Sequence, residues 1–215
     1  SLSGDRPFPD LSQRMNVGEL VYEDQANGMQ KKRRMLYADE PGMGKSASAI
    51  MAKEYVGAKC AVIISPGGMV ETWKNYLSDK FDDSGKQIGY FKPGQAPRVL
   101  VADSPQKLAS ISTEDYDYII LSHGRLKSTY TDLLKNIAFD MLIVDEAHEF
   151  KNIEQGIKSN ELIKLSDYVA EQPDSYTLML SATPAPNKVS DIAMILRVLH
   201  PGAFLHEDGT PMTNK

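Results

Sequence analysis

The 215-residue sequence contains one cysteine, Cys60, which excludes an internal disulfide framework and a cysteine-rich zinc site. No apolar run approaches the roughly 20 residues of a membrane-spanning helix, and the N-terminus lacks a signal-peptide pattern. Cys60 opens the run Cys-Ala-Val-Ile-Ile, so we expect a buried and unreactive thiol. These absences predict an intracellular protein in a reducing compartment, with no membrane partner.

The sequence also lacks an excess of basic residues, because its formal net charge is −5. This charge argues against nucleic-acid binding through a global positive field, although it leaves room for a local binding track. The one dense basic cluster is Lys31, Lys32, Arg33 and Arg34. We interpret it as a solvated helix end beside a strand, with a phosphate contact as the alternative.

Six short apolar runs, several of them rich in β-branched residues, are separated by helical patterns. Such nearly continuous runs are typical of a parallel sheet with helices covering both faces. The sequence therefore predicts one open, doubly wound α/β domain over residues 1–200, with its ligands at the carboxyl ends of the strands. The expected strands are 35–38, 61–64, 99–102, 118–121, 141–144 and 177–180, and the expected helices are 19–30, 45–56, 69–78, 104–110, 123–135, 155–170 and 188–199.

Two segments fall outside this alternation. Residues 79–97 are rich in turn-forming residues, and we expect a surface excursion there. Residues 201–215 show no periodicity and are rich in glycine and polar residues, so we expect the start of a linker.

The segment Ala-Asp-Glu-Pro-Gly-Met-Gly-Lys-Ser at 38–46 resembles a phosphate-binding loop between a strand and a helix. Gly42 and Gly44 allow backbone amides to converge on a phosphate, and the helix N-terminus adds unsatisfied N–H groups. We expect Lys45 to reach the β- and γ-phosphates and the Ser46 hydroxyl to bind Mg²⁺. The general pattern has a glycine where this sequence has Asp39. The alternative is a glycine-rich turn before an unrelated helix.

The segment Leu-Ile-Val-Asp-Glu-Ala-His at 142–148 places two adjacent carboxylates after an apolar strand. We expect Asp145 to hold Mg²⁺ and Glu146 to orient or deprotonate the attacking water. A solvated acidic turn is the alternative. Together with the phosphate loop, the pair predicts a site that binds and hydrolyses ATP.

These segments resemble superfamily 2 helicases and translocases, specifically the Swi/Snf-like, DEAH-box ATPases. Asp39 fits that family's phosphate loop, Asp-Glu-x-Gly-x-Gly-Lys-Ser/Thr. The resemblance runs in the family's order over about residues 19–204, through the segments at 62–76, 116–126, 139–152, 180–192 and 199–204. It implies a RecA-like P-loop NTPase domain that binds ATP and Mg²⁺. Ser-Ala-Thr at 181–183 departs from the Thr-Gly-Thr common in Swi/Snf relatives.

The resemblance also implies roles for single residues. Gln25 resembles the glutamine that recognises adenine, with a solvated helix residue as the alternative. His148 resembles the histidine that contacts Ser181 and Thr183 and connects the nucleotide to the nucleic-acid face. Its alternative is a satisfied polar residue in a turn.

In such proteins, loops after strands contact nucleic-acid phosphates. The candidates are Pro66, Gly67, Ser122, His123 and Arg125, each of which has an ordinary connecting loop as its alternative.

The family's enzymes place ATP between two RecA-like lobes, and the second lobe supplies arginines worth about a thousandfold or more in rate. No segment of this sequence resembles the second lobe. The resemblance therefore implies the first lobe of a translocase that acts on double-stranded DNA and needs a second lobe, in cis or in trans, for full hydrolysis. A strand-separating DNA or RNA helicase is one alternative, and a non-catalytic nucleotide-binding or partner-binding adaptor is the other.

Overall fold

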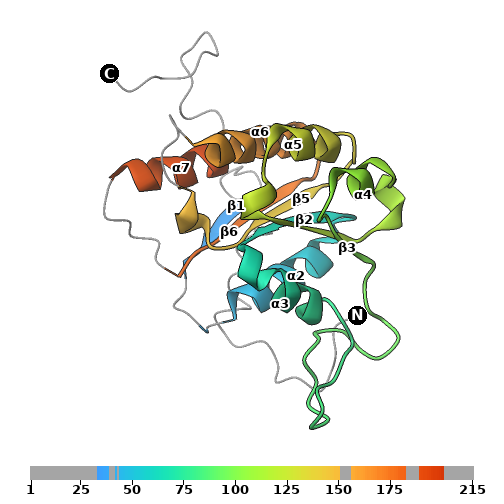
Figure 1. Ribbon diagram of the computed structural model, residues 1–215. Helices are drawn as coiled ribbons and strands as arrows, with labels where there is room; N and C mark the ends of the chain where they lie inside the picture. The colour runs from blue at the N-terminus through green and yellow to red at the C-terminus, as the bar shows by residue number, and fades with distance from the viewer. Residues whose placement is uncertain (1–32, 39–41, 43, 151–155, 183–188, 201–215) are drawn as a thin grey trace, which may run out of the picture.

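The computed structural model describes residues 33–38, 42, 44–150, 156–182 and 189–200. In this part of the chain, six parallel strands form one sheet in the order β1-β6-β5-β2-β4-β3, with helices on both faces (Figure 1). The predicted α/β class and all six predicted strands are confirmed. The strands are β1 (Arg34–Tyr37), β2 (Ala61–Ser65), β3 (Val99–Val101), β4 (Tyr118–Ser122), β5 (Met141–Val144) and β6 (Tyr176–Leu180).

The central strands are apolar along their whole length because each face of the sheet is buried under a separate layer. In β2, Val62 and Ile64 pack into the core under the helices α4 to α7, which lie within residues 105–199, whereas Ala61 and Ile63 pack into the core under α2 and α3, which lie within residues 45–76. All four side chains are fully buried. This alternation between two cores explains why the strands read as unbroken apolar runs.

The helices follow the predicted periodicity with one correction. The region 123–135 is not one helix, because the chain is extended at Leu126 and Lys127 between η3 and α5. The predicted helix at 19–30 lies outside the described residues. The helices are α2 (Lys45–Val56), α3 (Val70–Tyr76), α4 (Pro105–Ala109), α5 (Ser128–Lys135), α6 (Ile157–Glu171) and α7 (Val189–Leu199), with 3-10 turns η1 (Gly67–Met69), η2 (Thr113–Asp115), η3 (His123–Arg125) and η4 (Ala147–Glu149).

The predicted surface excursion at 79–97 has no regular element except an isolated bridge between Phe81 and Gln87. It is anchored by Phe91, which is buried in the core under α2 and α3. Among the described residues, no helix has the length and apolar character needed to cross a bilayer.

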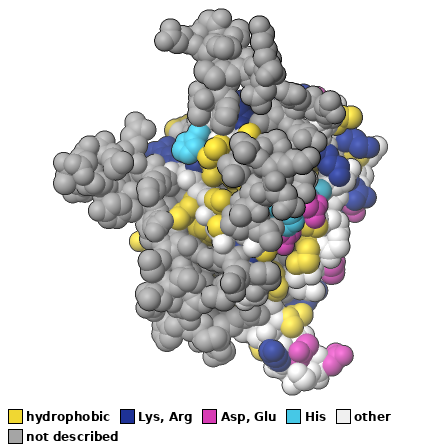
Figure 2. All heavy atoms as spheres, turned by 90° about the vertical axis from the view of Figure 1, so that its left-hand side faces the viewer, with side chains coloured by type: hydrophobic (Ala, Val, Ile, Leu, Met, Phe, Trp, Pro, Cys, Tyr) yellow, Lys and Arg dark blue, Asp and Glu magenta, His cyan; other side chains and the backbone are white. Residues whose placement is uncertain are grey.

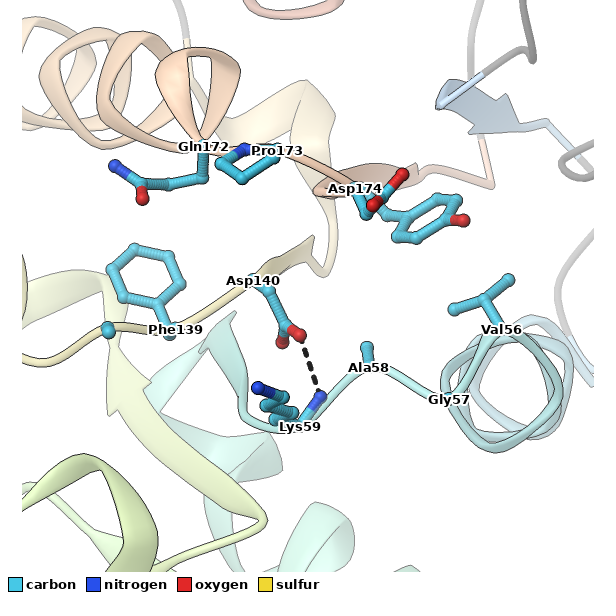
Figure 3. A pocket seen from close by; sticks show the side chains of 11 residues that line it. Val56, Gly57, Ala58, Lys59, Phe139, Asp140, Gln172, Pro173 and Asp174 are labelled. Atoms are coloured by element: carbon cyan, nitrogen blue, oxygen red, sulfur yellow. Dashed lines mark hydrogen bonds between the residues drawn. The ribbon is translucent and has the colours of Figure 1, made fainter.

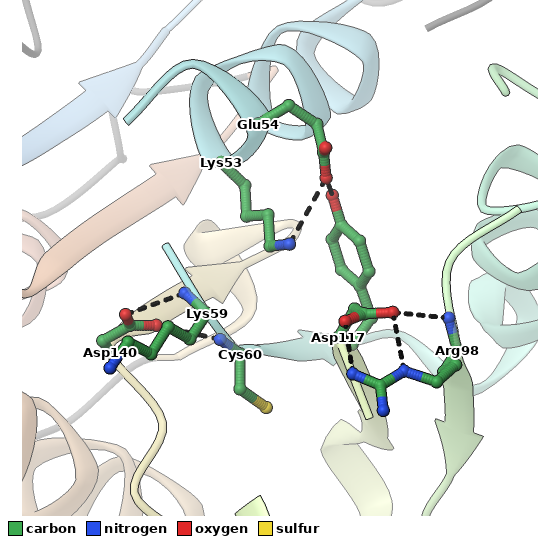
Figure 4. Close-up of polar contacts among 8 residues, drawn as sticks. Lys53, Glu54, Lys59, Cys60, Arg98, Asp117 and Asp140 are labelled. Atoms are coloured by element: carbon green, nitrogen blue, oxygen red, sulfur yellow. Dashed lines mark hydrogen bonds and ion pairs between the residues drawn. The ribbon is translucent and has the colours of Figure 1, made fainter. Parts of the chain in front are cut away.

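The edge of the sheet where the strands begin is held by paired polar groups (Figure 4). The carboxylate of Asp140 accepts hydrogen bonds from the backbone N–H groups of Lys59 (2.8 Å) and Cys60 (3.0 Å). Arg98 and Asp117 form an ion pair at 2.9 Å. Burial raises the pKa of the Cys60 thiol to about 12, which agrees with the unreactive core cysteine expected from the sequence.

A second group at this edge surrounds the ammonium of Lys53, whose side chain is almost fully buried. It lies 3.3 Å from Glu54 Oε1 and 4.7 Å from the centre of the Tyr118 ring. The Tyr118 hydroxyl donates to the same carboxylate oxygen at 3.0 Å (Figure 4). The buried cation is therefore paired and also rests on an aromatic face.

The basic cluster at 31–34 needs a correction at its C-terminal end. Arg34 is half-buried and is not a purely solvated residue, because its Nη1 donates to Ser166 Oγ at 3.3 Å and to the Val198 carbonyl at 3.2 Å. Burial lowers the pKa of this guanidinium. Arg34 therefore connects β1 to α6 and α7, whereas Arg33 forms an exposed ion pair with Asp174 at 2.8 Å.

Candidate active site

The strand that precedes the predicted phosphate loop, β1, and the strand that precedes the predicted acidic pair, β5, end at the same edge of the sheet. Strand β6 lies between β1 and β5, and its registers pair Tyr37 with Leu180 and Val144 with Met179. Because neighbouring strands are about 4.8 Å apart, the ends of β1 and β5 are separated by roughly 10 Å. Seen end-on in Figure 2, this side of the molecule shows histidine and acidic side chains lying together among hydrophobic ones.

The phosphate loop turns into α2 through glycines with left-handed backbone. Gly42 has φ 83° and Gly44 has φ 78°, values that strain any residue with a Cβ. Helix α2 begins at Lys45, and its first backbone bond runs from Ser48 N to Gly44 O at 2.9 Å. Lys45 and Ser46 therefore occupy the first turn of the helix, at its N-terminal end.

Asp145 follows β5 as a nearly buried carboxylate. Its Oδ2 accepts a hydrogen bond from Trp73 Nε1 at 2.8 Å, and its Oδ1 accepts one from Glu146 N at 3.0 Å. Burial raises the pKa of Asp145, and the bond from Trp73 opposes that rise. A nearby cation favours the charged form of a buried carboxylate, so the chemistry of Asp145 fits the predicted Mg²⁺ ligand.

The two residues that the sequence assigns to Mg²⁺, Ser46 and Asp145, both offer oxygen atoms, which are the ligands that this ion takes. No cluster of three or more His, Cys, Asp or Glu side chains suited to a metal occurs in the described part of the chain. Mg²⁺ is commonly held by one or two protein oxygens together with phosphate oxygens and waters. Ser46 and Asp145 would supply these two protein oxygens.

Glu146 has a left-handed backbone, with φ 48° and ψ 52°, which is uncommon for a residue with a long side chain. Its Oε2 lies 3.1 Å from His148 Nδ1, without the geometry of a full hydrogen bond. His148 Nδ1 also lies 3.3 Å from Ser181 Oγ, at the end of β6. The His148 side chain thus lies between Glu146 and the residue that follows β6.

The nucleic-acid candidates divide into exposed and buried groups. Gly67 and Arg125 are exposed, and Arg125 Nε donates to the Asp103 carbonyl at 2.9 Å. Pro66 is half-buried, and Ser122 is buried.

His123 is 4% exposed, and both of its ring nitrogens have partners inside the protein. Nδ1 lies 2.9 Å from Glu149 Oε2, and Nε2 lies 3.0 Å from the Asp145 carbonyl oxygen. The ring also packs edge-on against Phe150, with 4.6 Å between the ring centres. In this structure, the His123 ring therefore supports the acidic pair and is not presented to a phosphate.

Three predicted site residues, Gln25, Asp39 and Thr183, lie outside the described residues. Conversely, sequence reasoning gave no site role to Trp73 or to Glu149. The only available signal for Trp73 was its position in a family-like segment.

A cavity of about 610 Å³ lies at the opposite edge of the sheet, where the strands begin. Figure 3 shows it between the C-terminal ends of α2 and α6, with Lys59, Asp140 and Asp174 around it. Its walls include none of the predicted site residues. The candidate active site therefore rests on side-chain placement at the strand ends and not on this cavity.

Comparison with known proteins gives a consistent match. The profile of the SNF2-related domain matches residues 20–209. The uncharacterized ATP-dependent helicase YqhH of Bacillus subtilis is 28% identical over 91% of this chain and 30% of its own length. The DNA repair and recombination protein RAD54B of Homo sapiens is 25% identical over 78% of this chain and 17% of its own length.

Among solved structures, the Sulfolobus solfataricus SWI2/SNF2 ATPase core in complex with dsDNA aligns with a TM-score of 0.65 and 24% identity. The alignment covers 92% of this chain and 37% of that one, and it supports the fold. This chain thus spans a third or less of the curated relatives above.

Proposed function

The chain belongs to the SNF2-related domain family, and from this membership we propose that it is the ATP-binding lobe of a DNA-stimulated translocase. The observation that supports this proposal is that the start of α2 and the acidic residue Asp145 lie at the same edge of the sheet. The left-handed glycines that open α2 face the same edge as the buried carboxylate of Asp145. The shared edge gives phosphate and metal one common place to bind.

The residues divide the work of phosphoryl transfer. Lys45 and the first-turn N–H groups of α2 bind the phosphates, and Ser46 and Asp145 orient the metal. When bound, Mg²⁺ would neutralise charge on the phosphate oxygens. Glu146 would hold the attacking water and accept its proton. His148 Nδ1 lies 3.1 Å from Glu146 Oε2, so a movement of the Glu146 side chain would change this contact.

The arginines support the need for a second lobe. Each arginine in the described part of the chain has a partner outside the candidate site. Arg197, in α7, makes two 2.8 Å bonds to the carboxylate of Asp167. The partners of the others are Asp174 for Arg33, Ser166 and Val198 for Arg34, Asp117 for Arg98 and Asp103 for Arg125. We propose that a second lobe supplies the arginine that stabilises the transferring phosphoryl group.

The proposed substrate track is double-stranded DNA, as in the complex of the archaeal ATPase core. Exposed Gly67 and Arg125, in turns that follow β2 and β4, would contact its backbone. An intracellular location follows from such a partner. The acidic segment at 145–148 has the sequence Asp-Glu-Ala-His. The proposal rests on the SNF2-related family and does not require assignment to a DEAH-box subgroup.

Thermal unfolding with and without Mg-ATP tests the proposal. At 100 times the dissociation constant, a ligand stabilises a protein by about 2.7 kcal/mol, or about 5–10 °C for a chain of this size. Lys45→Ala should lose this stabilisation, whereas Lys59→Ala, at the opposite edge, should keep it. No stabilisation of the wild-type chain, or equal stabilisation of Lys45→Ala, would contradict the proposal and favour the adaptor.

A further inference from the structure

Trp73 is the chain's only tryptophan, and it touches the acidic pair directly. It lies in α3, is fully buried, and donates its Nε1–H to Asp145 Oδ2 at 2.8 Å. Its ring packs in the core under α2 and α3 and meets Tyr76 edge-on, with 6.4 Å between ring centres. The core packing therefore fixes where this N–H donor points.

The bond has a specific consequence for Asp145. Indole N–H is a donor only, so this bond always occupies a lone pair of Oδ2. Glu146 N occupies a lone pair of Oδ1 at 3.0 Å. With one donor on each oxygen, the carboxylate plane is fixed and its remaining lone pairs have a set direction.

His123 holds the backbone of the same residue. Its Nε2 lies 3.0 Å from the Asp145 carbonyl oxygen, and Glu149 fixes the other side of the ring at 2.9 Å. Asp145 N donates to the Ile64 carbonyl at 2.8 Å. Both the side chain and the peptide of Asp145 are therefore held by groups from other elements.

We propose that Trp73 and His123 are positioning residues that pre-orient the Asp145 carboxylate for the metal of the Mg-ATP complex. The inference rests on the proposed function, because it requires Asp145 to hold that metal. Groups that orient a metal ligand through hydrogen bonds commonly contribute 10- to 100-fold to metal affinity. Trp73 accordingly contributes a donor as well as core packing.

The wild-type chain gives the first test without any substitution. Because Trp73 is the sole tryptophan, its emission reports on its bonded carboxylate. We expect the emission to shift when Mg²⁺ is added to the ATP-saturated chain, and to stay unchanged on the same addition to Asp145→Ala. Mg-dependent ATP binding without an emission shift would overturn the inference and leave the proposed function intact.

The second test separates positioning from packing. ATP affinity of Trp73→Phe should fall about 10-fold or more in Mg²⁺ and stay unchanged in EDTA, as measured by calorimetry. Leu77→Ala removes packing from the same core but leaves the contacts of Asp145 in place. This variant should therefore have a lower thermal stability and the same ATP affinity in Mg²⁺ as the wild type. Equal ATP affinities of Trp73→Phe and the wild type in Mg²⁺ would overturn the inference.

His123 is tested by a conservative pair. A glutamine can still donate an N–H toward the Asp145 carbonyl, whereas an alanine cannot. We expect His123→Ala to raise the Mg²⁺ concentration needed for ATP binding and His123→Gln to restore most of it. If both behave alike, the role of His123 is overturned. If the wild-type chain shows no Mg-dependent ATP binding, the proposed function and this inference fall together.

Discussion

The two edges of the sheet differ in how they hold their charged residues. At the edge where the strands begin, the charged groups are paired, whereas at the edge where the strands end, acidic residues have energetically unfavourable burial or backbone conformation. Asp140 caps two backbone N–H groups and Asp117 pairs with Arg98 at the first edge. At the second edge, Asp145 is a buried carboxylate with a raised pKa, and Glu146 has a left-handed backbone. The first arrangement stabilises the fold, and the second leaves groups whose charge and geometry a ligand can satisfy.

The largest expected effect comes from removing the carboxylate at the edge where the strands end. Asp145→Ala should abolish the Mg-dependent part of ATP binding, a loss of about 100-fold or more, because the metal loses its protein carboxylate. The fold should survive, because removal of a desolvated charge offsets the loss of the acceptor for the buried Trp73 N–H. Isothermal calorimetry with Mg²⁺ and with EDTA measures both parts. If Asp145→Ala keeps its Mg-dependent ATP affinity, the edge where the strands end is not the ligand-binding edge.

The matched substitution at the other edge should have the reverse effect. Asp140→Ala leaves the N–H groups of Lys59 and Cys60 without their acceptor, which should lower the free energy of unfolding by about 1–3 kcal/mol. Its ATP affinity should equal that of the wild type. Urea unfolding measures the loss of stability, and calorimetry measures the ATP affinity. A weakened ATP affinity of Asp140→Ala would contradict the separate roles of the two edges.

A smaller effect should distinguish the two non-glycine residues with positive φ that the structure describes, one at each edge. These are Glu146 (φ 48°) and Asp174 (φ 53°). Aspartate tolerates this conformation better than glutamate. Glu146→Gly should therefore stabilise the chain by about 0.5–1 kcal/mol, whereas Asp174→Gly should give almost no gain. Denaturant midpoints measure the difference, and equal changes would show that strain does not distinguish the edges.

The smallest effects should appear in the pH dependence, with opposite signs at the two edges. Burial raises the pKa of Asp145, so folding is favoured by its protonation and that contribution is lost as pH rises through the folded-state value. The hydrogen bond from Arg98 lowers the pKa of Asp117, so its contribution is present above about pH 4 and is lost on further acidification.

The unfolding free energy of the ligand-free chain, measured across pH, should show both signs. Asp145→Ala should remove a gain in stability on mild acidification, and Asp117→Asn should remove a loss at lower pH. Shifts of the same sign in both variants would refute this contrast.

Much of the fold was predictable because local pattern and tertiary environment agree. Each central strand is buried on both faces, so its sequence is apolar throughout and was recognised as a strand of a parallel sheet. The break at Leu126 was missed because the pattern at 123–135 is helical on its own, whereas the buried ring of His123 belongs to a separate turn.

The placement of candidate residues was predictable where one short segment carries them, as with Lys45 at the start of α2 and Asp145 directly after β5, and their roles stay predictions. It was not predictable where the contact joins distant segments. Trp73 and Asp145 are 72 positions apart, and only the packing of α3 against the sheet brings them together. Arg34 was misjudged for the same reason, because its partners Ser166 and Val198 come from helices much later in the chain.

The position of β6 also has a consequence for the order of folding. In the described sheet β1 pairs with β6, and this joins Arg34 to Thr177 across most of the chain. During synthesis, the strand that leads into the phosphate loop emerges early but has to wait for the last strand before it joins the sheet. Such a contact of long sequence separation forms late, because its loop-closure entropy has to be offset by the rest of the core. Nucleotide binding should therefore be among the last properties that a newly made chain acquires.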